Sequence, residues 1–464
     1  MQTFVAFRAI LILAAALLSG CAATSVFNPY PNQALAFRQA TSGLDTAGVL
    51  LKLDSKRAGA DGMLYMMERG RIDQLQGDYA ASKADFEQAI AGFEAASDKA
   101  RLSLSGVGAG GISMFTNDNA LPYKGQAYER VMVHQFQAFN YLGLGDIEGA
   151  TVELRRAQQV QREQELKYAE EIAKAQSEAE QKSVFLGEFD QYFTGMDGIT
   201  GTLKNSFQNG YSFYTAAVIR EAIGEYNDAL VDYKKALELA PGNAQLRADV
   251  IRANEYFDGK AARVATGKNG KPAARTPAGT VVVLFEQGFV PAKKPVGLAI
   301  PTTDGGIFSI QFPVYDGTDY TPPAPLTVRL PDGSSGQTEV LVNTGALAVK
   351  SLREQIPALL LRQVLRARAK YEMQKKAAEQ GGVFGQLAAN IYNMASEQAD
   401  LRSWLTLPAN AQALRLSVPA GMQNIELVSG MGSLSVPVDV KDRKTTIIRA
   451  VEVNGRLITQ TFAL

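Results

Sequence analysis

Three segments in the first half of the sequence share one residue pattern, which is that of two helices packed as a hairpin. In the clearest copy, residues 222–243, Gly224 marks a turn, and Ala229 and Ala236 follow seven residues apart. Residues at this spacing lie on one face of a helix, where small side chains let a second helix approach closely and Tyr233 fills the gap beside them. The pattern therefore predicts two closely packed helices joined at Gly224.

The other two copies are residues 74–93 and 141–158, with turn glycines at Gly77 and Gly145. All three copies resemble the second half of a tetratricopeptide (TPR) repeat. This resemblance implies a stack of helical hairpins, an α-solenoid, whose concave face holds a partner helix or an extended segment. We therefore expect a TPR-like helical domain over residues 21–256.

The spacing of apolar residues changes beyond residues 257–280, an Ala/Gly/Lys-rich stretch that is typical of a linker. Short runs rich in β-branched residues and bounded by Pro, Gly or Asp predict nine strands. These runs are residues 280–285, 307–315, 326–330, 338–342, 413–421, 424–430, 433–440, 444–453 and 456–462. Two helices are expected between them, at 346–379 and 384–398. The predicted fold class is α+β: a solenoid, then a β-rich, sandwich-like domain over 281–464 with a helical insertion at about 346–398.

The only cysteine of the 464-residue chain, Cys21, follows an apolar run. Arg8 supplies a positive charge before ten apolar residues, 9–18, which are too few to cross a bilayer. Small residues come next, as they do before the cleavage site of a secretory signal peptide. We therefore expect residues 1–20 to be a signal peptide. The alternative is a buried N-terminal helix in which the thiol has no role.

The four residues Leu18-Ser19-Gly20-Cys21 resemble the bacterial lipobox. This resemblance implies cleavage between Gly20 and Cys21, a diacylglycerol on the cysteine sulfur and an acylated amino group. Three acyl chains such as palmitate exceed the two signals that stable membrane anchoring needs. Ala22 stands where aspartate is the usual signal for retention in the inner membrane. The resemblance therefore implies a lipid anchor in the outer membrane, with the protein facing the periplasm.

Three longer stretches are similar to an uncharacterised group of TPR-containing bacterial lipoproteins. They are LPYKGQAYERVMVH (121–134), VVVLFEQGFVP (281–291) and NIYNMASEQADLRSWLTLP (390–408). The stretch 418–444 weakly resembles small β-sandwich modules of the PEGA type. These resemblances imply a place in the cell envelope, and they imply no particular reaction.

Composition argues against several classes of function. Lys and Arg together number 47, as do Asp and Glu, so no overall field favours nucleic acid as a partner. One histidine, His134, and one lipidated cysteine cannot form a zinc site of ordinary ligation. No Gly-x-Ser-x-Gly nucleophile motif accompanies His134. We therefore expect a protein that is not an enzyme and that has no metal or cofactor.

The main candidate site is the concave face of the solenoid. Helical offset from the repeats places six residues there: Arg71, Gln74, Gln135, Phe139, Tyr214 and Glu221. His134 falls at a repeat position that often holds an inward-packing tryptophan. It is therefore either a core histidine or part of a binding site together with Tyr123 and Glu129. The leading hypothesis is a periplasmic adaptor that grips an envelope protein in this groove.

The alternative function is binding of peptidoglycan or lipopolysaccharide through the β-rich domain. The stretch 357–376 is a basic amphipathic helix that includes Arg366 and Arg368. Such a helix either lies on anionic lipid or polymer phosphate, or packs one face on a sheet and leaves the other in water. Trp404, the only tryptophan, is either a core anchor or an exposed platform for stacking on a glycan.

Overall fold

The computed structural model describes residues 29–104, 119, 121–181, 186–201, 203–257, 277–301, 307–396 and 398–464. The predicted signal peptide, the cleavage site at Gly20 and Cys21, and most of the predicted linker lie outside these residues. Within the described part of the chain, no helix combines the length and the apolar composition that a membrane span requires.

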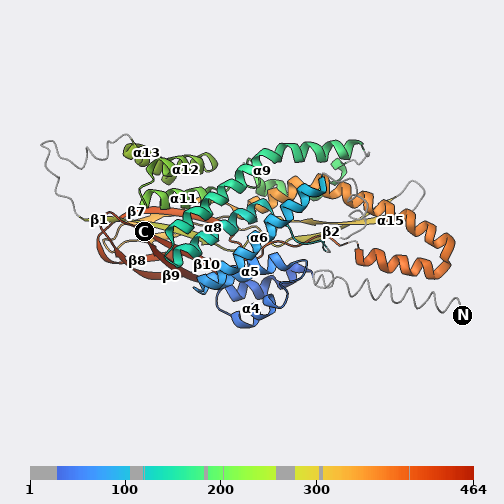
Figure 1. The fold of residues 1–464 in the computed structure, drawn as a ribbon, viewed down its shortest axis with the longest axis horizontal. Helices are drawn as coiled ribbons and strands as arrows, with labels where there is room; N and C mark the ends of the chain where they lie inside the picture. Colours follow the sequence, from blue (N-terminus) through green and yellow to red (C-terminus); the bar gives the residue numbers. More distant parts are fainter. Residues whose placement is uncertain are drawn as a thin grey trace.

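Helices make up the first half of the described chain (Figure 1). In chain order they are η1 (Tyr30–Gln33), α3 (Ala34–Thr41), α4 (Thr46–Asp54), α5 (Gly62–Leu75), α6 (Tyr79–Leu104), α8 (Ala127–Gly143), α9 (Ile147–Gln181), η3 (Leu186–Tyr192), α10 (Thr194–Thr200), α11 (Gly210–Ala222), α12 (Tyr226–Leu239) and α13 (Ala244–Phe257).

The three predicted hairpins are confirmed as the pairs α5–α6, α8–α9 and α11–α12. They turn at Gly77, Gly145 and Gly224, whose φ angles are +86°, +79° and +90°. These angles lie in the left-handed region, where a Cβ is unfavourable and glycine is the usual residue after a helix. Ala229 and Ala236 are fully buried, as expected for small residues on a face that a second helix approaches. The repeated pattern therefore encodes the turns and the packed faces.

Strands dominate the second half. They are β1 (Ala278–Gln287), β2 (Lys294–Pro301), β3 (Ile307–Val314), β4 (Thr327–Arg329), β5 (Ser335–Gln337), β6 (Glu339–Val342), β7 (Asn410–Pro419), β8 (Gly421–Ser429), β9 (Gly432–Val440), β10 (Thr445–Val453) and β11 (Arg456–Ala463). All nine predicted strands are present. The sequence pattern missed β5, which has three residues, and β2, whose two prolines and one glycine obscure the strand signal.

Two of the sheets form a sandwich. One has the strand order β11-β10-β1-β7-β6, with β1 parallel to β10 and antiparallel to β7, and the other has the order β5-β4-β8-β9. Val281 and Val283 of β1 and Ile425 and Leu427 of β8 belong to the core between the two sheets. Successive side chains of a strand point to opposite faces. The residues of β1 between these valines therefore face away from the sandwich, toward the helices.

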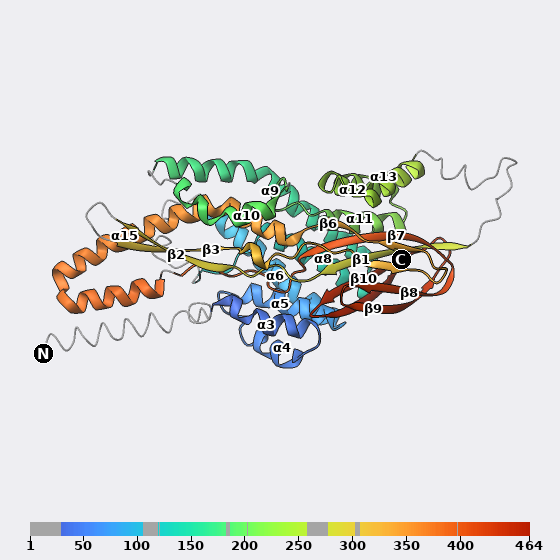
Figure 2. The same cartoon turned by 180° about the vertical axis from the view of Figure 1, so that it is seen from behind.

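The helices of the solenoid cover this second face of the five-stranded sheet, and the result is three layers (Figures 1 and 2). Val282 and Leu284 of β1 belong to the same buried cluster as Phe136 of α8 and Phe139. The helical and β-rich parts were expected to be separate domains joined by a linker. They instead share one hydrophobic core.

The predicted helical pair between the strands is a single helix, α15 (Thr344–Ser396), of 53 residues. The two glycines at 381 and 382 were expected to separate the two helices. They lie inside α15 instead. Figure 2 shows its ribbon leaving the body and turning back toward its C-terminal end. The insertion is therefore present, and its subdivision into two helices was wrong.

We expect glycine to be required at these turns because of the backbone conformation. A larger side chain would have enough space there. A Cβ at Gly224 would meet nothing within 4 Å, but the φ of +90° is unfavourable for alanine. Gly224→Ala should therefore lower the free energy of unfolding by about 1–2 kcal/mol. Urea unfolding of the Cys21→Ser chain measures this change.

Gly242→Ala is the matched control, because Gly242 also has open space around its Cβ position and has no positive φ. Equal losses from the two substitutions would contradict the conformational explanation.

Candidate functional site

Of the six residues predicted to line an open concave face, five are buried and the sixth is mostly buried. Five of them have side chains exposed by 1% or less: Arg71, Gln74, Gln135, Phe139 and Tyr214. The side chain of the sixth, Glu221, is 14% exposed. The expectation of a groove that is open to a partner is therefore wrong.

The five-stranded sheet of the same chain fills the concave face. The guanidinium of Arg71 on α5 donates to Glu286 of β1, with 2.5 Å between Nη2 and Oε2. The ring of Phe139 on α8 stacks on Phe462 of β11, with centroids 6.0 Å apart. Polar and aromatic side chains that were expected to contact a partner in an open groove contact β-strands of the same chain instead.

Glu286 is the centre of the contact between helices and sheet. Its Oε1 accepts from Arg449 Nε at 2.7 Å and from the Tyr211 hydroxyl at 2.9 Å, and its Oε2 accepts from Arg71 and from Arg449 Nη2 at 3.0 Å. The side chains of Glu286 and Arg449 are fully buried. All four acceptor positions of the carboxylate are thus used. This group joins three other elements, α5, α11 and β10, to β1 and has no acceptor position left for a substrate.

The charged groups of this cluster are stabilised by one another and by aromatic rings, because they are buried away from water. Burial alone would raise the pKa of Glu286, but Arg449 and Arg71 outweigh that effect and hold the pKa at about 2. Two guanidinium groups face one carboxylate, so one positive charge remains. The guanidinium carbon of Arg71 lies 4.2 Å from the ring centre of Phe136, and that of Arg449 lies 4.3 Å from the ring centre of Phe139. The negative ring faces stabilise the remaining charge.

A second ionic cluster binds the last hairpin to the sheet. Arg415 of β7 lies 3.0 Å from a carboxylate oxygen of Glu221 on α11 and 2.8 Å from one of Asp249 on α13. It also donates to the hydroxyl of Tyr233 on α12 at 2.5 Å. Burial would raise the pKa of Glu221, but Arg415 and Arg252 lower it below its ordinary value. Tyr214, another predicted concave residue, donates to Asp249 at 3.1 Å.

A segment of the same chain without helix or strand, residues 398–409, lies between the first two hairpins. The backbone N–H groups of Leu405 and Thr406 donate to Glu68 on α5, at 2.7 and 3.2 Å, and that of Trp404 donates to Glu129 on α8 at 2.9 Å. Burial raises the pKa of Glu68 to about 7, although these hydrogen bonds partly oppose the shift. The repeats thus bind an irregular segment, and that segment belongs to the protein itself.

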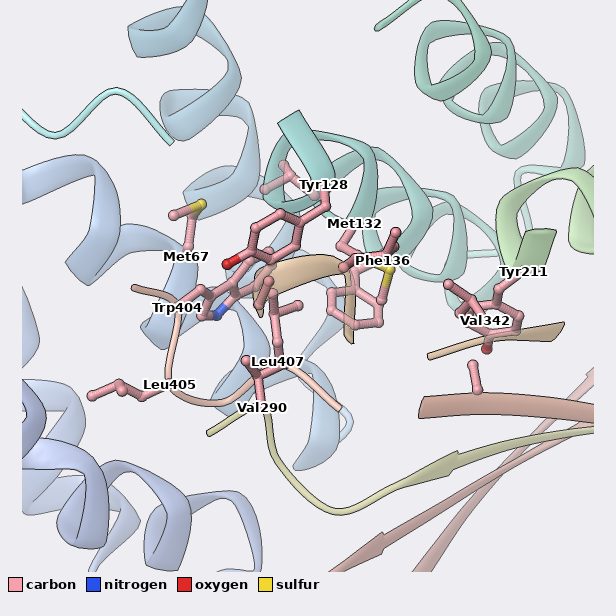
Figure 3. Close-up of a cluster of buried hydrophobic side chains, with 14 of the residues drawn as sticks. Met67, Tyr128, Met132, Phe136, Tyr211, Val290, Val342, Trp404, Leu405 and Leu407 are labelled. Atoms are coloured by element: carbon pink, nitrogen blue, oxygen red, sulfur yellow. The ribbon is translucent and has the colours of Figure 1, made fainter. Parts of the chain in front are cut away.

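Trp404 anchors this segment in the core and is 1% exposed. Its ring lies 5.9 Å from that of Phe86 and 5.6 Å from that of Phe136, both edge to face. Figure 3 shows Trp404 and Leu407 directed between Met67 of α5 and the side chains of α8. The core interpretation of Trp404 is confirmed, and an exposed platform for a glycan is excluded.

Tyr123, Glu129 and His134 do not form one site. The Tyr123 hydroxyl donates to Glu129 at 2.5 Å, and the same carboxylate accepts from the backbone N–H of Gln126 at the start of α8. His134 instead lies 2.7 Å from Glu153 on α9 and is buried. It is a core histidine with a carboxylate partner, and Tyr123 and Glu129 are buried in the contact between α8 and the segment 398–409.

The two arginines of the alternative polymer-binding site lie in different environments. Arg366 on α15 is 4% exposed, whereas Arg368 is exposed. With Trp404 buried, the set of Arg366, Arg368 and Trp404 does not form a single surface. The expectation that these three residues contact an envelope polymer together is wrong.

Among the cavities formed by the described residues, two lie at the edges of the body. One, of about 310 Å³, lies where the described chain begins, between Pro29, the β2–β3 hairpin and Arg402. Arg402 donates from there to Asp400 and Asp61. The other, of about 250 Å³, lies between the C-terminal end of α12 and β6. Among the residues that the structure describes, no group of three or more His, Cys, Asp or Glu side chains is arranged to hold a metal ion.

Comparison with known proteins identifies no family. No protein-family model matches the chain, and no curated protein is significantly similar to it. A solved structure of the TPR2AB-domain:pHSP90 complex of yeast Sti1 is 13% identical, and the match covers 51% of this chain and 88% of that one. Its TM-score is 0.17, which is too low to support an argument about this protein.

The central ionic residues were not predicted from the sequence, although a signal was present. Glu286 stands within the apolar run VVVLFEQ, and Arg449 stands within TTIIRAVEV. Both strands are buried along almost their whole length. A charged residue in such a strand requires a partner from another element. That rule would have singled out both residues, but not the helix that supplies Arg71.

We expect Glu286 to make stability depend on pH. Its folded pKa of about 2 lies below its ordinary value of 4.5, so its contribution is fully present above about pH 4.5 and is lost as the pH falls toward 2. The shift corresponds to about 3 kcal/mol. Glu286→Gln should therefore cost about 3–5 kcal/mol at neutral pH, because two buried guanidinium groups lose their counter-ion. Urea unfolding from about pH 7 down to about pH 3 should show this cost becoming smaller.

Glu426→Gln is the control, because Glu426 forms an exposed pair with Arg329 at 3.3 Å. It should change stability by at most about 1 kcal/mol. A cost for Glu286→Gln that stays the same at every pH would contradict the role of its charge.

We also expect the helical and β-rich parts to unfold together, because Trp404 and the ionic clusters join them in one core. Trp404 is the only tryptophan, so its fluorescence reports this contact. Fluorescence and far-ultraviolet circular dichroism should follow one coincident transition in urea. Trp404→Ala should lower the free energy of unfolding by about 3–5 kcal/mol. Two separate transitions of the parent protein would show that the two parts fold independently.

Proposed function

We propose that the protein is a non-enzymatic adaptor of the bacterial cell envelope, anchored by lipid on Cys21 to the periplasmic face of the outer membrane. The match of Leu18-Ser19-Gly20-Cys21 to the lipobox, directly after a short apolar run, supports the anchor. The stacked helical hairpins support a role in protein–protein interaction. The partner in this proposal is another protein of the envelope.

The partner does not bind in the concave face, because the sheet occupies it. It binds an arm that consists of α9, α15 and the β2–β3 hairpin. The observation that supports this choice is that both long helices extend beyond the body, with the hairpin beside α15 (Figures 1 and 2). Leu166 on α9 is 82% exposed, the highest value among the large apolar side chains that the structure describes. A single exposed leucine is ordinary, so the extension of the two helices beyond the body, and not this side chain alone, supports the choice.

The arm is held in one position by specific contacts. Tyr168 on α9 donates to Glu354 on α15 at 2.6 Å. Arg353 on α15 pairs with Asp197 of α10 at 3.0 Å, and its guanidinium lies 5.4 Å from the ring centre of Phe193. The ring of Phe312 on β3 packs on Phe193 with centroids 5.4 Å apart. A surface that is already ordered loses little conformational entropy when it binds.

Binding of peptidoglycan or lipopolysaccharide is the weaker proposal. Its aromatic contact, Trp404, is buried, and one of its two arginines, Arg366, is buried as well. Only exposed basic residues such as Arg368 remain for it, and these lie on the same arm.

Photo-crosslinking in cells tests the adaptor proposal. A photoreactive residue at Leu166 should give crosslinks to a discrete envelope protein, and substitution of Cys21 by Ser should abolish them together with membrane fractionation and palmitate labelling. The matched control is the same residue at Ile251 on α13, which is 62% exposed but lies outside the arm.

Two results would count against the proposal. Crosslinks at Ile251 that equal those at Leu166 would remove the arm as the binding surface. A Cys21→Ser chain that fractionates with membranes as firmly as the parent would remove the lipid anchor.

A further inference from the structure

The strand β11 forms one edge of the five-stranded sheet, and no other strand of the described chain pairs with its outer side. The turn Asn454-Gly455 joins it to β10, and both residues have positive φ, as in a two-residue hairpin turn. Val453 and Arg456 flank this turn and exchange hydrogen bonds, so the direction of each later N–H follows by alternation. Four residues, the outward positions, therefore direct their N–H and C=O groups away from β10: Leu457, Thr459, Thr461 and Ala463.

Nothing in the sequence of β11 blocks pairing at this edge. Residues 457–463, LITQTFA, contain no proline, glycine or charged residue, and β-branched and aromatic residues favour the extended conformation. The pairing with β10 continues along the strand without a bulge. Thr461 and Ala463 are exposed, and Leu457 and Thr459 are half-buried. An uncharged strand edge of this kind is a template for pairing with another strand.

The other edges of the two sandwich sheets are short, covered or interrupted. In β9, alternation from the hairpin turn at 430–431 places Pro437 at an outward position, where it has no N–H to donate. The edge of β6 lies beside α11, and the side chain of Asn243 donates to the carbonyl of Val340 at 3.0 Å. The edge strand β5 has only three residues. Among the edges that the structure describes in these two sheets, β11 is therefore the long one without a feature that prevents pairing.

We propose that β11 pairs antiparallel with β11 of a second copy of the protein, so that the two five-stranded sheets form one continuous sheet. A two-fold axis at Gln460 uses all four outward positions. Thr459 then lies opposite Thr461 of the second copy. Leu457 lies opposite Ala463 of the second copy. This pairing depends neither on the lipid anchor nor on a partner at the arm, so it goes beyond the proposed function.

The side chains favour a second copy over a strand from another protein. Two identical edges bring like residues together, and the stretch 457–463 carries no charge that would repel its own copy. The same lack of charge offers a different protein little to recognise. The register about Gln460 places threonine beside threonine, and it places Ile458 opposite Phe462 of the second copy. Both kinds of cross-strand pair stabilise sheets.

The contact is small, and we therefore expect a reversible dimer. One pair of eight-residue strands buries less than the roughly 800 Å² per partner of a stable interface. A method that traps the pair is thus the most direct test of its register.

Disulfide crosslinking of the full chain provides this test. In a Cys21→Ser background, one chain carries Thr459→Cys, and a second chain with a different tag carries Thr461→Cys. Hydrogen-bonded antiparallel neighbours have Cα atoms about 5.5 Å apart, which suits a disulfide, whereas two copies of the same position lie more than about 7 Å apart. Mild oxidation of the mixture should therefore give about fivefold more crosslinked dimer than oxidation of either chain alone.

The matched control is the pair Ser433→Cys and Ser435→Cys, which are exposed outward positions of β9 with the same spacing. Their crosslinks report random collisions. Equal yields from the β9 and β11 pairs would contradict the proposal. Crosslinks between identical positions of β11, without a 459–461 crosslink, would show another register and would contradict it as well.

A proline substitution tests the role of the backbone. Thr461→Pro removes an outward N–H and leaves the hydrogen bonds to β10 in place. Because the two-fold axis removes two hydrogen bonds from each dimer, the dissociation constant should rise by about tenfold or more. Thr461→Val keeps the N–H and the branched shape, and it should change the constant by less than about twofold.

Sedimentation velocity of the Cys21→Ser chain measures these constants, and circular dichroism shows whether each variant is folded. A parent chain that stays monomeric up to about 1 mM rules out the dimer. Equal dissociation constants for a folded Thr461→Pro chain and its parent would show that β11 does not form the contact. A photoreactive residue at Thr461 that crosslinks in cells to another protein, and not to a second copy, would show a strand from a different partner and would also overturn the proposal.

Discussion

The carboxylate of Glu286 is the constraint on which the architecture depends. Removing an ion from water costs several kcal/mol, and only well-directed partners offset this cost. Those partners come from α5, α11 and β10, which are parts of both the solenoid and the sheet. The charge can therefore be buried only when the two parts meet in one relative position. The surrounding apolar contacts supply most of the stabilisation, but they do not fix this position as sharply.

This constraint also decides where a partner does not bind. The solenoid has the features of a binding groove, namely polar and aromatic side chains along the first helix of each hairpin. The chain occupies the groove itself, with the five-stranded sheet and with the segment 398–409, whose backbone donates to Glu68 and Glu129. An external ligand would have to replace these internal hydrogen bonds and leave buried charges without partners. The cost of that exchange favours the arm over the groove as a contact surface.

Local features of the fold were predictable, and contacts between distant segments were not. The hairpins at Gly77, Gly145 and Gly224 and nine strands follow from spacing within about twenty residues, where side-chain geometry dictates the pattern. The pairing of Arg71 with Glu286 joins residues that lie 215 positions apart. One sequence contains no information about such a pairing beyond the presence of a charge in an apolar strand. The prediction of a groove was therefore correct about the helices that form it and wrong about its exposure to solvent.

The same packing joins the elements between the α3–α4 corner and the arm into one body. The turn after β10 holds the α3–α4 corner through Asn454 and Arg456, while β3 packs against α10 and α15 at the base of the arm. β10 in turn supplies Arg449 to Glu286. In the proposed function, the lipid anchor before this corner and a partner on the arm would thus be connected through packed elements. For the proposed adaptor, such packing would limit how far the partner can lie from the membrane, which a lipid anchor alone would not do.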